Sequence, residues 1–386
     1  MVLGYAAGVP TTPTPASDAQ LVTLDDFRRA ARAALPQLTW DYYRSGADGQ
    51  RTLRDNRHAF RHWQLWPRVL VDVSTRNLET TVLGVPVTLP VLVAPTAYQC
   101  LAHPEGERAT ARAAAAAGTV MCVSTLGTTS LEDIAASAAV PRWFQLYVHR
   151  DRELTAELVR RAEAAGYRAL VITVDTPILG RRLADERNRF HLPPHLTMAN
   201  FTAAAARAAV RDEEALAHQA SGGSALEHYF AARHDDTFSW RDLDWLRSLT
   251  TLPLVLKGVL RPDDALRAVD HGAAGVIVSN HGARQLDGVP ATIDALPAIA
   301  GALDGRAEVY VDGGIRWGGD ILKALALGAR AVLLGRPILW GLAVGGEPGV
   351  RRVIELMREE LSRALALAGQ RDVRHLDRDL VRRRET

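Results

Sequence analysis

From residue 90 onward, short apolar runs recur along the chain, and amphipathic stretches rich in Ala and Arg separate most of them. The runs are PVLVAPT (90–96), TVMCVST (119–125), WFQLYV (143–148), ALVITVD (169–175), PLVLKG (253–258), AGVIVSN (274–280), EVYVDGG (308–314) and AVLLGRP (331–337). Nearly continuous apolar runs with many β-branched residues are typical of parallel strands that are buried on both faces. The pattern therefore predicts eight parallel strands.

The stretches between these runs have the spacing of helices. HPEGERATARAAAAAG, RELTAELVRRAEAAG and RPDDALRAVDHG are amphipathic and end in Gly, a residue that often follows a helix C-terminus. Eight alternating strand and helix units predict an α/β fold of the (β/α)8, or TIM, barrel type. A doubly wound open sheet is the alternative, but no GxGxxG motif follows the first run to support it.

Two segments fall outside this repeat. Residues 1–20 are rich in Pro, Thr and Ala and predict a flexible tail. A helical extension then begins near Thr23, a suitable N-cap, and opens a single domain over residues 21–386. The fourth and fifth runs are separated by residues 176–252, and within them residues 198–238 contain a Ser-Gly-Gly break. A connection this long inside a barrel predicts a mobile lid insertion.

Composition excludes several classes of protein. The 386 residues are 47% hydrophobic and 23% charged, as in ordinary globular proteins, and a net charge of +2 does not favour a nucleic-acid partner. No apolar run approaches the roughly 18 residues that span a bilayer. Residues 1–20 contain no Lys or Arg, so a signal peptide is not expected, and Cys100 and Cys122 form no metal or disulfide motif. We expect a cytoplasmic protein without a metal site.

Potential functional residues gather where the predicted strands end. In chain order they are Pro95, Thr96, Ala97; Ser124; Gln145, Tyr147; Thr173, Asp175; Lys257; Ser279, His281, Arg284; Asp312, Gly313, Gly314, Arg316; and Gly335, Arg336. Each alone has an ordinary structural explanation, such as a helix cap or a surface ion pair. The complete ring is hard to explain by packing, and catalytic groups of barrels lie at the C-terminal ends of the strands.

The ring predicts a flavin nucleotide. DGGIR and LGRP follow the last two strands, where barrels commonly bind phosphate through glycine amides and arginine. Neutral donors and acceptors on the earlier strands suit a flat heterocycle. Lys257 is one of only two lysines, against 44 arginines, and a compact positive charge there would stabilise the negative charge of a reduced flavin. FMN has both the ring and the phosphate.

The remaining charged groups predict acid–base chemistry on an anionic substrate. Asp175 can orient His281 and stabilise its protonated form. Arg182 and Arg284 can hold a carboxylate by paired hydrogen bonds. A base beside a bound carboxylate and a flavin is the equipment for oxidising a 2-hydroxy acid.

At this point the motifs resemble those of a known family. DYYRSGA, APTAYQCLAHPEGE, FQLYV, TVDTPILGRR, LKGV, SNHGARQLD, DGGIR and GRP are similar to the FMN-dependent L-2-hydroxy acid oxidases and dehydrogenases, which include glycolate, lactate and hydroxymandelate oxidases. The likeness covers residues 22–365. It implies an FMN-dependent (S)-2-hydroxy acid oxidase that passes electrons to O2, releases H2O2 and forms a homotetramer.

The resemblance also implies roles for individual residues. His281 would be the base and Asp175 its partner, while Arg182, Arg284, Tyr42 and Tyr147 would bind and polarise the substrate. The implied FMN contacts are Pro95, Thr96, Ala97, Ser124, Gln145, Thr173, Lys257, Ser279, Asp312, Gly313, Gly314, Arg316, Gly335 and Arg336. Transfer of a hydride and formation of a carbanion are both open as mechanisms.

Three positions bear on the substrate and product. Leu126 stands where glycolate oxidases have Trp, and Tyr98 where glycolate oxidase has Met and hydroxymandelate oxidase has Tyr. Both favour a substrate that is larger or more apolar than glycolate, such as lactate or mandelate. Ala97 stands where lactate monooxygenases have Gly, which favours release of H2O2.

Other functions remain as alternatives. A dehydrogenase using a quinone or protein acceptor is the nearest, although residues 198–238 do not resemble the apolar anchor of the membrane-bound dehydrogenases. A flavin-binding protein without turnover and an isomerase or aldolase acting on a phosphorylated substrate are the others, because a fold does not determine a function.

Overall fold

The computed structural model describes residues 21–201, 224–376 and 378–384. Eight parallel strands close into a barrel in which each strand pairs with the next along the chain and the last pairs with the first. They are β4 (Val91–Val93), β5 (Met121–Ser124), β6 (Arg142–Leu146), β7 (Ala169–Thr173), β8 (Leu254–Val259), β9 (Gly275–Val278), β10 (Glu308–Asp312) and β11 (Ala331–Leu334). The predicted (β/α)8 barrel is confirmed.

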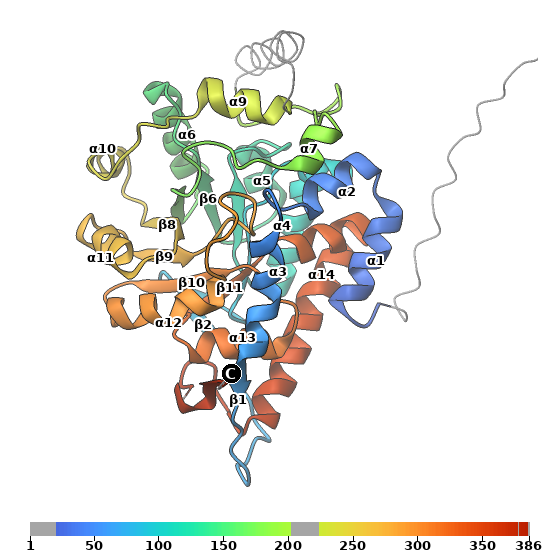
Figure 1. Ribbon diagram of the computed structural model, residues 1–386, viewed down its shortest axis with the longest axis vertical. Coiled ribbons are helices and arrows are strands. Elements are labelled where there is room, and N and C mark those ends of the chain that lie inside the picture. The colour runs from blue at the N-terminus through green and yellow to red at the C-terminus, as the bar shows by residue number, and fades with distance from the viewer. Residues whose placement is uncertain (1–20, 202–223, 377, 385–386) are drawn as a thin grey trace, which may run out of the picture.

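Helices surround the barrel on its outside (Figure 1). They are α4 (Gly106–Ala117), α5 (Leu131–Ser137), α6 (Arg152–Ala164), α10 (Asp242–Ser248), α11 (Pro262–Asp270), α12 (Thr292–Leu303), α13 (Gly318–Ala326) and α14 (Arg336–Leu367). The helix α4 ends at Gly118, whose left-handed backbone is favourable for Gly, as the sequence predicts. The connection between β7 and β8 differs from the others because it carries α7 (Leu183–Arg187) and α9 (Ala225–Arg233) before the short α10.

The barrel interior is filled with side chains, and its N-terminal end is closed by a hairpin. Trp143 and Tyr310 meet edge to face inside the barrel with ring centroids 5.2 Å apart. The hairpin of β2 (Thr80–Val82) and β3 (Val85–Val87) buries Val82 and Val87 against this inner core. The opposite, C-terminal end of the barrel is therefore the end at which a ligand can enter.

The N-terminal extension packs beside the barrel and meets the C-terminus. It consists of α1 (Leu24–Ala34), α2 (Gln37–Arg44) and α3 (Arg51–His58), followed by β1 (Trp63–Leu65). Thr23 caps α1 through a capping box with Asp26, as predicted, and α1 packs on α14. The strand β1 pairs antiparallel with β12 (Val381–Arg383), so the two ends of the barrel domain are joined.

One predicted segment lies wholly outside the described residues, and another lies partly outside them. The predicted tail, residues 1–20, lies outside them, and so do residues 202–223 of the predicted lid. The described part of that lid contains α9, which crosses the upper end of the barrel in Figure 1. Over the described residues, no helix combines the length and apolarity that crossing a membrane requires.

Candidate active site

One pocket at the C-terminal end of the barrel is lined by residues from the ends of all eight strands. Of the residues predicted from the sequence, it brings together Tyr42, Pro95, Thr96, Ala97, Ser124, Leu126, Gln145, Tyr147, Thr173, Arg182, Lys257, His281, Arg284, Asp312, Gly313, Gly314, Arg316, Gly335 and Arg336. Asp175 and Ser279 lie behind the lining residues. Asp175 hydrogen-bonds to His281, and Ser279 hydrogen-bonds to Lys257 and to His281. Ser124, Gln145, Thr173, Lys257 and Asp312 lie at or near the C-terminal ends of their strands, and most of the other predicted residues stand in the loops that follow.

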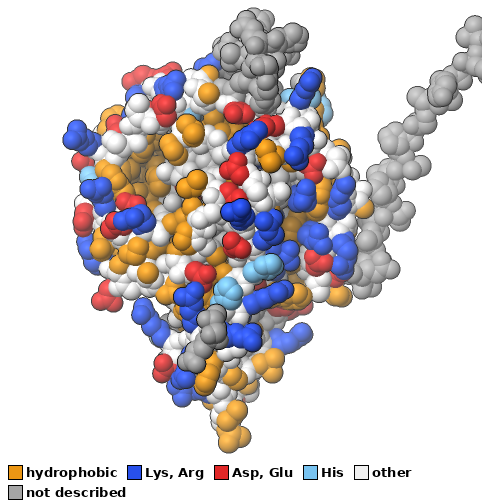
Figure 2. Space-filling model, viewed as in Figure 1, with side chains coloured by type: hydrophobic (Ala, Val, Ile, Leu, Met, Phe, Trp, Pro, Cys, Tyr) orange, Lys and Arg blue, Asp and Glu red, His pale blue; other side chains and the backbone are white. Residues whose placement is uncertain are grey.

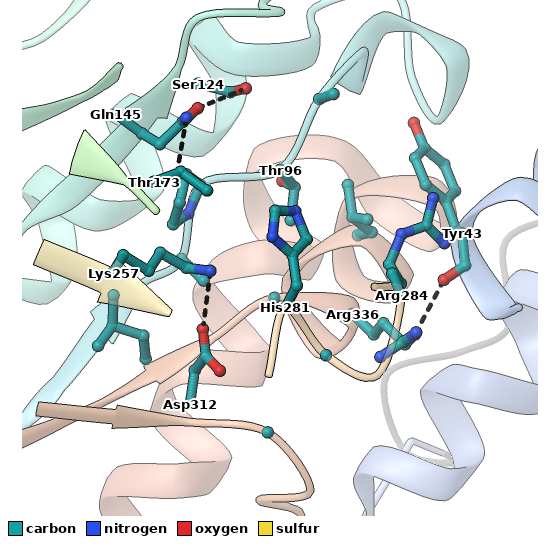
Figure 3. Close-up of a pocket in the computed structure, with 18 of the residues that line it drawn as sticks. Tyr43, Thr96, Ser124, Gln145, Thr173, Lys257, His281, Arg284, Asp312 and Arg336 are labelled. Carbon is teal, nitrogen blue, oxygen red and sulfur yellow. Dashed lines mark hydrogen bonds and ion pairs between the residues drawn. The ribbon is translucent and has the colours of Figure 1, made fainter. Parts of the chain in front are cut away.

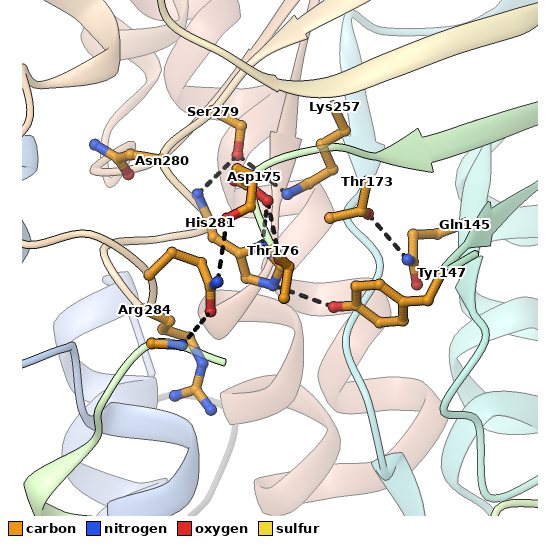
Figure 4. A network of polar contacts seen from close by, with 12 residues as sticks. Gln145, Tyr147, Thr173, Asp175, Thr176, Lys257, Ser279, Asn280, His281 and Arg284 are labelled. Carbon is orange, nitrogen blue, oxygen red and sulfur yellow. Dashed lines mark hydrogen bonds and ion pairs between the residues drawn. The ribbon is translucent and has the colours of Figure 1, made fainter. Parts of the chain in front are cut away.

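His281 and Asp175 form a hydrogen-bonded pair at the wall of this pocket (Figure 4). Nδ1 of His281 is 2.8 Å from Oδ1 of Asp175, and the Thr176 hydroxyl lies 3.1 Å from the same carboxylate oxygen. Burial lowers the pKa of His281, and Asp175 offsets only part of this effect. Although burial opposes ionisation of Asp175, its contact with His281 lowers its pKa. The pair is thus a neutral imidazole held by a carboxylate, which can take up a proton at Nε2.

The loop that carries His281 has an uncommon backbone. His281, Gly282 and Ala283 have consecutive positive φ angles of 58°, 61° and 63°. Such a conformation costs free energy in a non-glycine residue, and it persists where the surrounding structure enforces it. The Ser279 hydroxyl accepts a hydrogen bond of 3.0 Å from the His281 amide and thereby helps to fix the turn.

A second set of polar contacts lies on the neighbouring strands (Figures 3 and 4). The Lys257 ammonium donates to the Ser279 hydroxyl at 3.1 Å and lies 3.5 Å from Oδ2 of Asp312. Burial disfavours the charge of Lys257, but Asp312 and Asp175 raise its pKa, so the ammonium form is retained. A buried, charged lysine at the floor of a pocket can stabilise negative charge on a ligand.

Neutral polar groups follow on β5, β6 and β7. Gln145 donates from Nε2 to the Thr173 hydroxyl at 2.9 Å and accepts from the Ser124 hydroxyl at 3.3 Å (Figure 3). The three side chains are buried and are arranged by one another. Together they present hydrogen-bonding groups suited to the edge of a planar heterocycle.

Two guanidinium groups lie at the mouth of the pocket beside His281. Arg182 is 6% exposed, and burial together with the like charge of Arg284 lowers its pKa to about 10. Arg284 donates to the backbone carbonyls of Tyr42 and Ser45, and its guanidinium lies 4.9 Å from the ring centroid of Tyr42. Tyr147 places its hydroxyl 3.3 Å from Nε2 of His281, and burial raises the pKa of Tyr147, which keeps it a hydrogen-bond donor.

Two further arginines line the pocket, and Arg336 lies beside Arg284, since both donate to the Ser45 carbonyl. Arg336 donates to the carbonyls of Tyr43 and Ser45, and Arg316 donates to the carbonyl of Ile315. Burial lowers the pKa of both, to about 10 for Arg316. In the described part of the chain neither forms a salt bridge with a carboxylate. Half-buried cations without a carboxylate partner favour an anion, so this part of the pocket is suited to a dianionic group such as phosphate.

The pocket also contains residues that the sequence did not single out. Leu179, Leu226 and Phe230 line it, the last two from α9, and Phe230 packs edge to face on Tyr147. Leu226 and Phe230 lie in an irregular insertion and not at the end of a strand, so a search for residues at the strand ends could not predict their place in the pocket. Tyr98, by contrast, is buried behind Tyr42 at 5.8 Å between ring centroids and does not line the pocket; its contact with substrate stays a prediction.

The sequence of this chain matches the family model described as FMN-dependent dehydrogenase over residues 31–383. The chain belongs to the FMN-dependent dehydrogenase family. It is 54% identical to the L-lactate oxidase of Nostoc sp. over 92% of this chain and 96% of that protein. It is 50% identical to the 2-hydroxyacid oxidase 1 of Mus musculus over 94% of this chain and 97% of that protein.

Solved structures of the family agree with the fold. A mandelate oxidase bound to (S)-4-hydroxymandelic acid superposes with a TM-score of 0.86 at 47% identity, covering 92% of this chain and 98% of that chain. FMN is the cofactor of the family, and the residues that line the pocket fit FMN independently of this relationship. The two arginines without carboxylate partners match the phosphate, and Oδ1 of Asp312 is buried without a hydrogen-bond partner beside Gly313 and Gly314.

Proposed function

We propose that the protein oxidises an L-2-hydroxy acid to the 2-oxo acid and transfers the two electrons to O2, which is released as H2O2. The observation that carries this proposal is the His281–Asp175 pair, at 2.8 Å, facing the same pocket as the buried Arg182 and the half-buried Arg284. The oxidase relatives support the same reaction. FMN, when bound, supplies the ring that accepts the electrons.

In this proposal, His281 removes the proton of the substrate 2-hydroxyl, and FMN, when bound, would accept the hydrogen on C2 together with its bonding electron pair. Nδ1 is engaged by Asp175, so Nε2 is the nitrogen that faces the pocket and Tyr147. Asp175 stabilises the imidazolium that forms and keeps the ring in position. The protonated His281 then retains the proton at Nε2.

Arg182 and Arg284 bind the substrate carboxylate. Their charges lie side by side with one weak counterion, Asp185, whose Oδ2 is 3.8 Å from Arg182. An incoming carboxylate relieves the repulsion between the guanidiniums and is oriented by their planar forks. Tyr42 and Tyr147 contribute to the same clamp. Lys257, Ser124, Gln145 and Thr173 hold the flavin ring, and Arg316 and Arg336 its phosphate.

The side chain of the substrate meets an apolar wall. Leu126, Leu179, Leu226 and Phe230 line the pocket, and all four side chains are apolar. Burial of apolar substrate atoms against them is favourable by about 25 cal/mol per Å². We therefore propose a lactate-like or mandelate-like substrate in preference to glycolate.

The test is anaerobic mixing of the FMN-loaded protein with a series of L-2-hydroxy acids from glycolate to mandelate, followed by readmission of air. Bleaching of the flavin by one acid, with rapid recolouring and H2O2, is the expected result. Bleaching without recolouring would assign a dehydrogenase with another acceptor. Absence of bleaching by every acid would overturn the proposal.

Three wider expectations accompany this function. We propose that residues 198–238 act as a lid, because α9 contributes Leu226 and Phe230 to the pocket wall. We also propose a homotetramer, which light scattering coupled to size-exclusion chromatography would check. We propose a cytoplasmic location as well, which fractionation of the source cells would check.

A further inference from the structure

A second cavity lies on the outside of the barrel, between β7 and β8 and beneath α10. Its volume is about 430 Å³, which lies in the range of small-molecule sites. In Figure 2, hydrophobic side chains border a hollow at the left of the molecule, at the level where Figure 1 shows α10 and α11. The helix α10 borders the cavity through Leu243, and α11 borders it through Asp264.

The lining differs in charge from the FMN pocket. Asp235 and Asp264 line the second cavity, and no Lys or Arg is among the lining residues that the structure describes. The FMN pocket, by contrast, is lined by Lys257 and four arginines. A hydroxy acid, an oxo acid or a phosphate is therefore a poor match for the second cavity, because carboxylates repel anions.

Two of the polar groups in this cavity lack partners. Nδ1 of His234 has no hydrogen-bond partner within the described part of the chain although the residue is 6% exposed, and burial lowers the pKa of His234, so the ring is neutral. The Asp264 carboxylate is half-buried and forms no salt bridge with any described residue, whereas its neighbour Asp263 pairs with Arg261 at 2.6 Å. Asp235 is already paired with Arg152. His234 and Asp264 are thus available to a ligand that donates hydrogen bonds.

The rest of the wall is apolar and aromatic. Phe238 and Trp240 line the cavity together with Val174, Leu243 and Val259. The guanidinium of Arg152 already lies 5.5 Å from the ring centroid of Phe238, and that of Arg267 lies 5.4 Å from the ring centroid of Trp240. The aliphatic residues can still bury an apolar ligand body, and an ammonium group is attracted to a carboxylate. We propose that this cavity is a second ligand site, distinct from the FMN pocket, for a small arylalkyl ammonium compound whose ring lies against Val174, Leu243 and Val259 and whose ammonium binds Asp264.

The site lies close to the catalytic pair without being part of it. Thr176 lines the cavity, and its hydroxyl contacts Asp175 on the other side. His234 lines the cavity and packs edge to face on Tyr147 at 5.8 Å between centroids. The two cavities are therefore separated by one layer of side chains.

Calorimetric titration of the FMN-loaded protein with tryptamine tests the proposal. Saturable binding is expected with the same Kd in the presence of a saturating 2-oxo acid, and 3-indolepropionate, with the same ring and a negative charge, should not bind. Asp264→Asn should weaken binding about tenfold, as loss of one charge-assisted hydrogen bond predicts. Asp263→Asn is the matched control, one residue earlier in the same helical turn, and should leave the Kd unchanged.

Three results would overturn the proposal: no binding of tryptamine, displacement of tryptamine by the 2-oxo acid, or an equal Kd in the two variants. His234→Asn provides a second variant, which should also weaken binding, should Asp264→Asn fail to fold. Because oxidase activity is not the measured quantity, failure of this site and failure of the proposed function are distinguishable.

Discussion

The side chain of His281 is held from both ring nitrogens, and its backbone is held as well. Asp175 engages Nδ1, the Tyr147 hydroxyl faces Nε2, and Ser279 accepts from the main-chain amide. Because the positive φ of His281 costs free energy, these contacts also keep the loop in the conformation that presents the ring to the pocket.

The lowered pKa of His281 predicts the pH dependence of the reaction. Burial moves this pKa below its usual 6.5, so the neutral, proton-accepting form persists to lower pH than in a free histidine. We expect kcat/KM to be constant through neutral pH and to fall only below pH 6.5. Stopped-flow measurement of flavin reduction from pH 4.5 to 8 checks this. His281→Gln is the control: its rate should be lower by a factor of about 100 or more and should not fall further at low pH.

Lys257 and Lys323 allow a matched comparison, since they are the only lysines in the chain. Lys257→Arg should slow flavin reduction about 100-fold, because a planar guanidinium cannot replace a compact ammonium in a closed pocket. Lys323 donates to the Phe60 carbonyl away from the pocket, so Lys323→Arg should leave the rate unchanged. Equal rates in the two variants would remove Lys257 from the reaction.

Leu126 sets the size of the predicted substrate pocket. Leu126→Trp fills the apolar wall and should lower kcat/KM for mandelate relative to glycolate by about tenfold or more, the range expected for steric discrimination. The measurement is oxygen uptake with both acids. Leu101→Phe, outside the pocket lining, provides a control for general effects of a larger side chain. An unchanged ratio in Leu126→Trp would mean that the substrate side chain lies elsewhere.

At the scale of elements, strand β8 links the barrel to the catalytic pair. Its pairing with β9 is irregular between Lys257 and Val259, and Gly258 between them has a φ of 112°. A Cβ at Gly258 would come within 2.5 Å of Cβ and Cγ of Asp175. The irregular strand therefore directs Lys257 into the pocket and leaves room for the carboxylate behind His281.

This close approach predicts the effect of one added methyl group. Gly258→Ala should displace Asp175 and lower kcat about 100-fold, the loss expected from a misplacement near 1 Å. Gly166→Ala is the matched control, because Gly166 also has a positive φ, of 78°, but a Cβ there meets nothing within 4 Å. Gly166→Ala should lower the free energy of unfolding but leave kcat unchanged. Rapid-quench turnover measures kcat, and thermal unfolding measures stability. Equal kcat values in the two variants would contradict the prediction.

For the whole molecule, the pocket concentrates positive charge at one end of the barrel. Arg182, Arg284, Arg316 and Arg336 are drawn together there, and burial lowers the pKa of three of them. Mutual repulsion of this kind opposes folding unless an anion is bound. FMN and substrate are thus expected to stabilise the fold as well as to react.

Removal of FMN tests this idea. Since a ligand at 100 times its Kd contributes about 2.7 kcal/mol, the apoprotein should unfold at a clearly lower temperature than the FMN-loaded protein. Inorganic phosphate should restore part of the difference, while chloride at equal ionic strength should not. Calorimetry of the three samples measures it, and equal recovery with chloride would show that general screening is responsible.

The barrel and most of the pocket could be predicted from the sequence because both follow local rules. Nearly continuous apolar runs predict buried parallel strands, and polar residues after Thr173 or Val278 must then lie at one end of the barrel. Leu226 and Phe230 could not be predicted, because their place in the pocket depends on how the insertion folds back. Nor could the second cavity, because its lining combines β7 and β8 with residues 234–243 of the long connection between those strands.

The first and last barrel strands are hydrogen-bonded partners, and so are β1 and β12 near the two chain ends. Since β4 is synthesised long before β11, the barrel cannot close until β11 has been made. Until then, one edge of the growing sheet has no neighbour, and such an edge invites pairing with other nascent chains. We therefore expect synthesis to be most vulnerable to aggregation in the interval between these two strands.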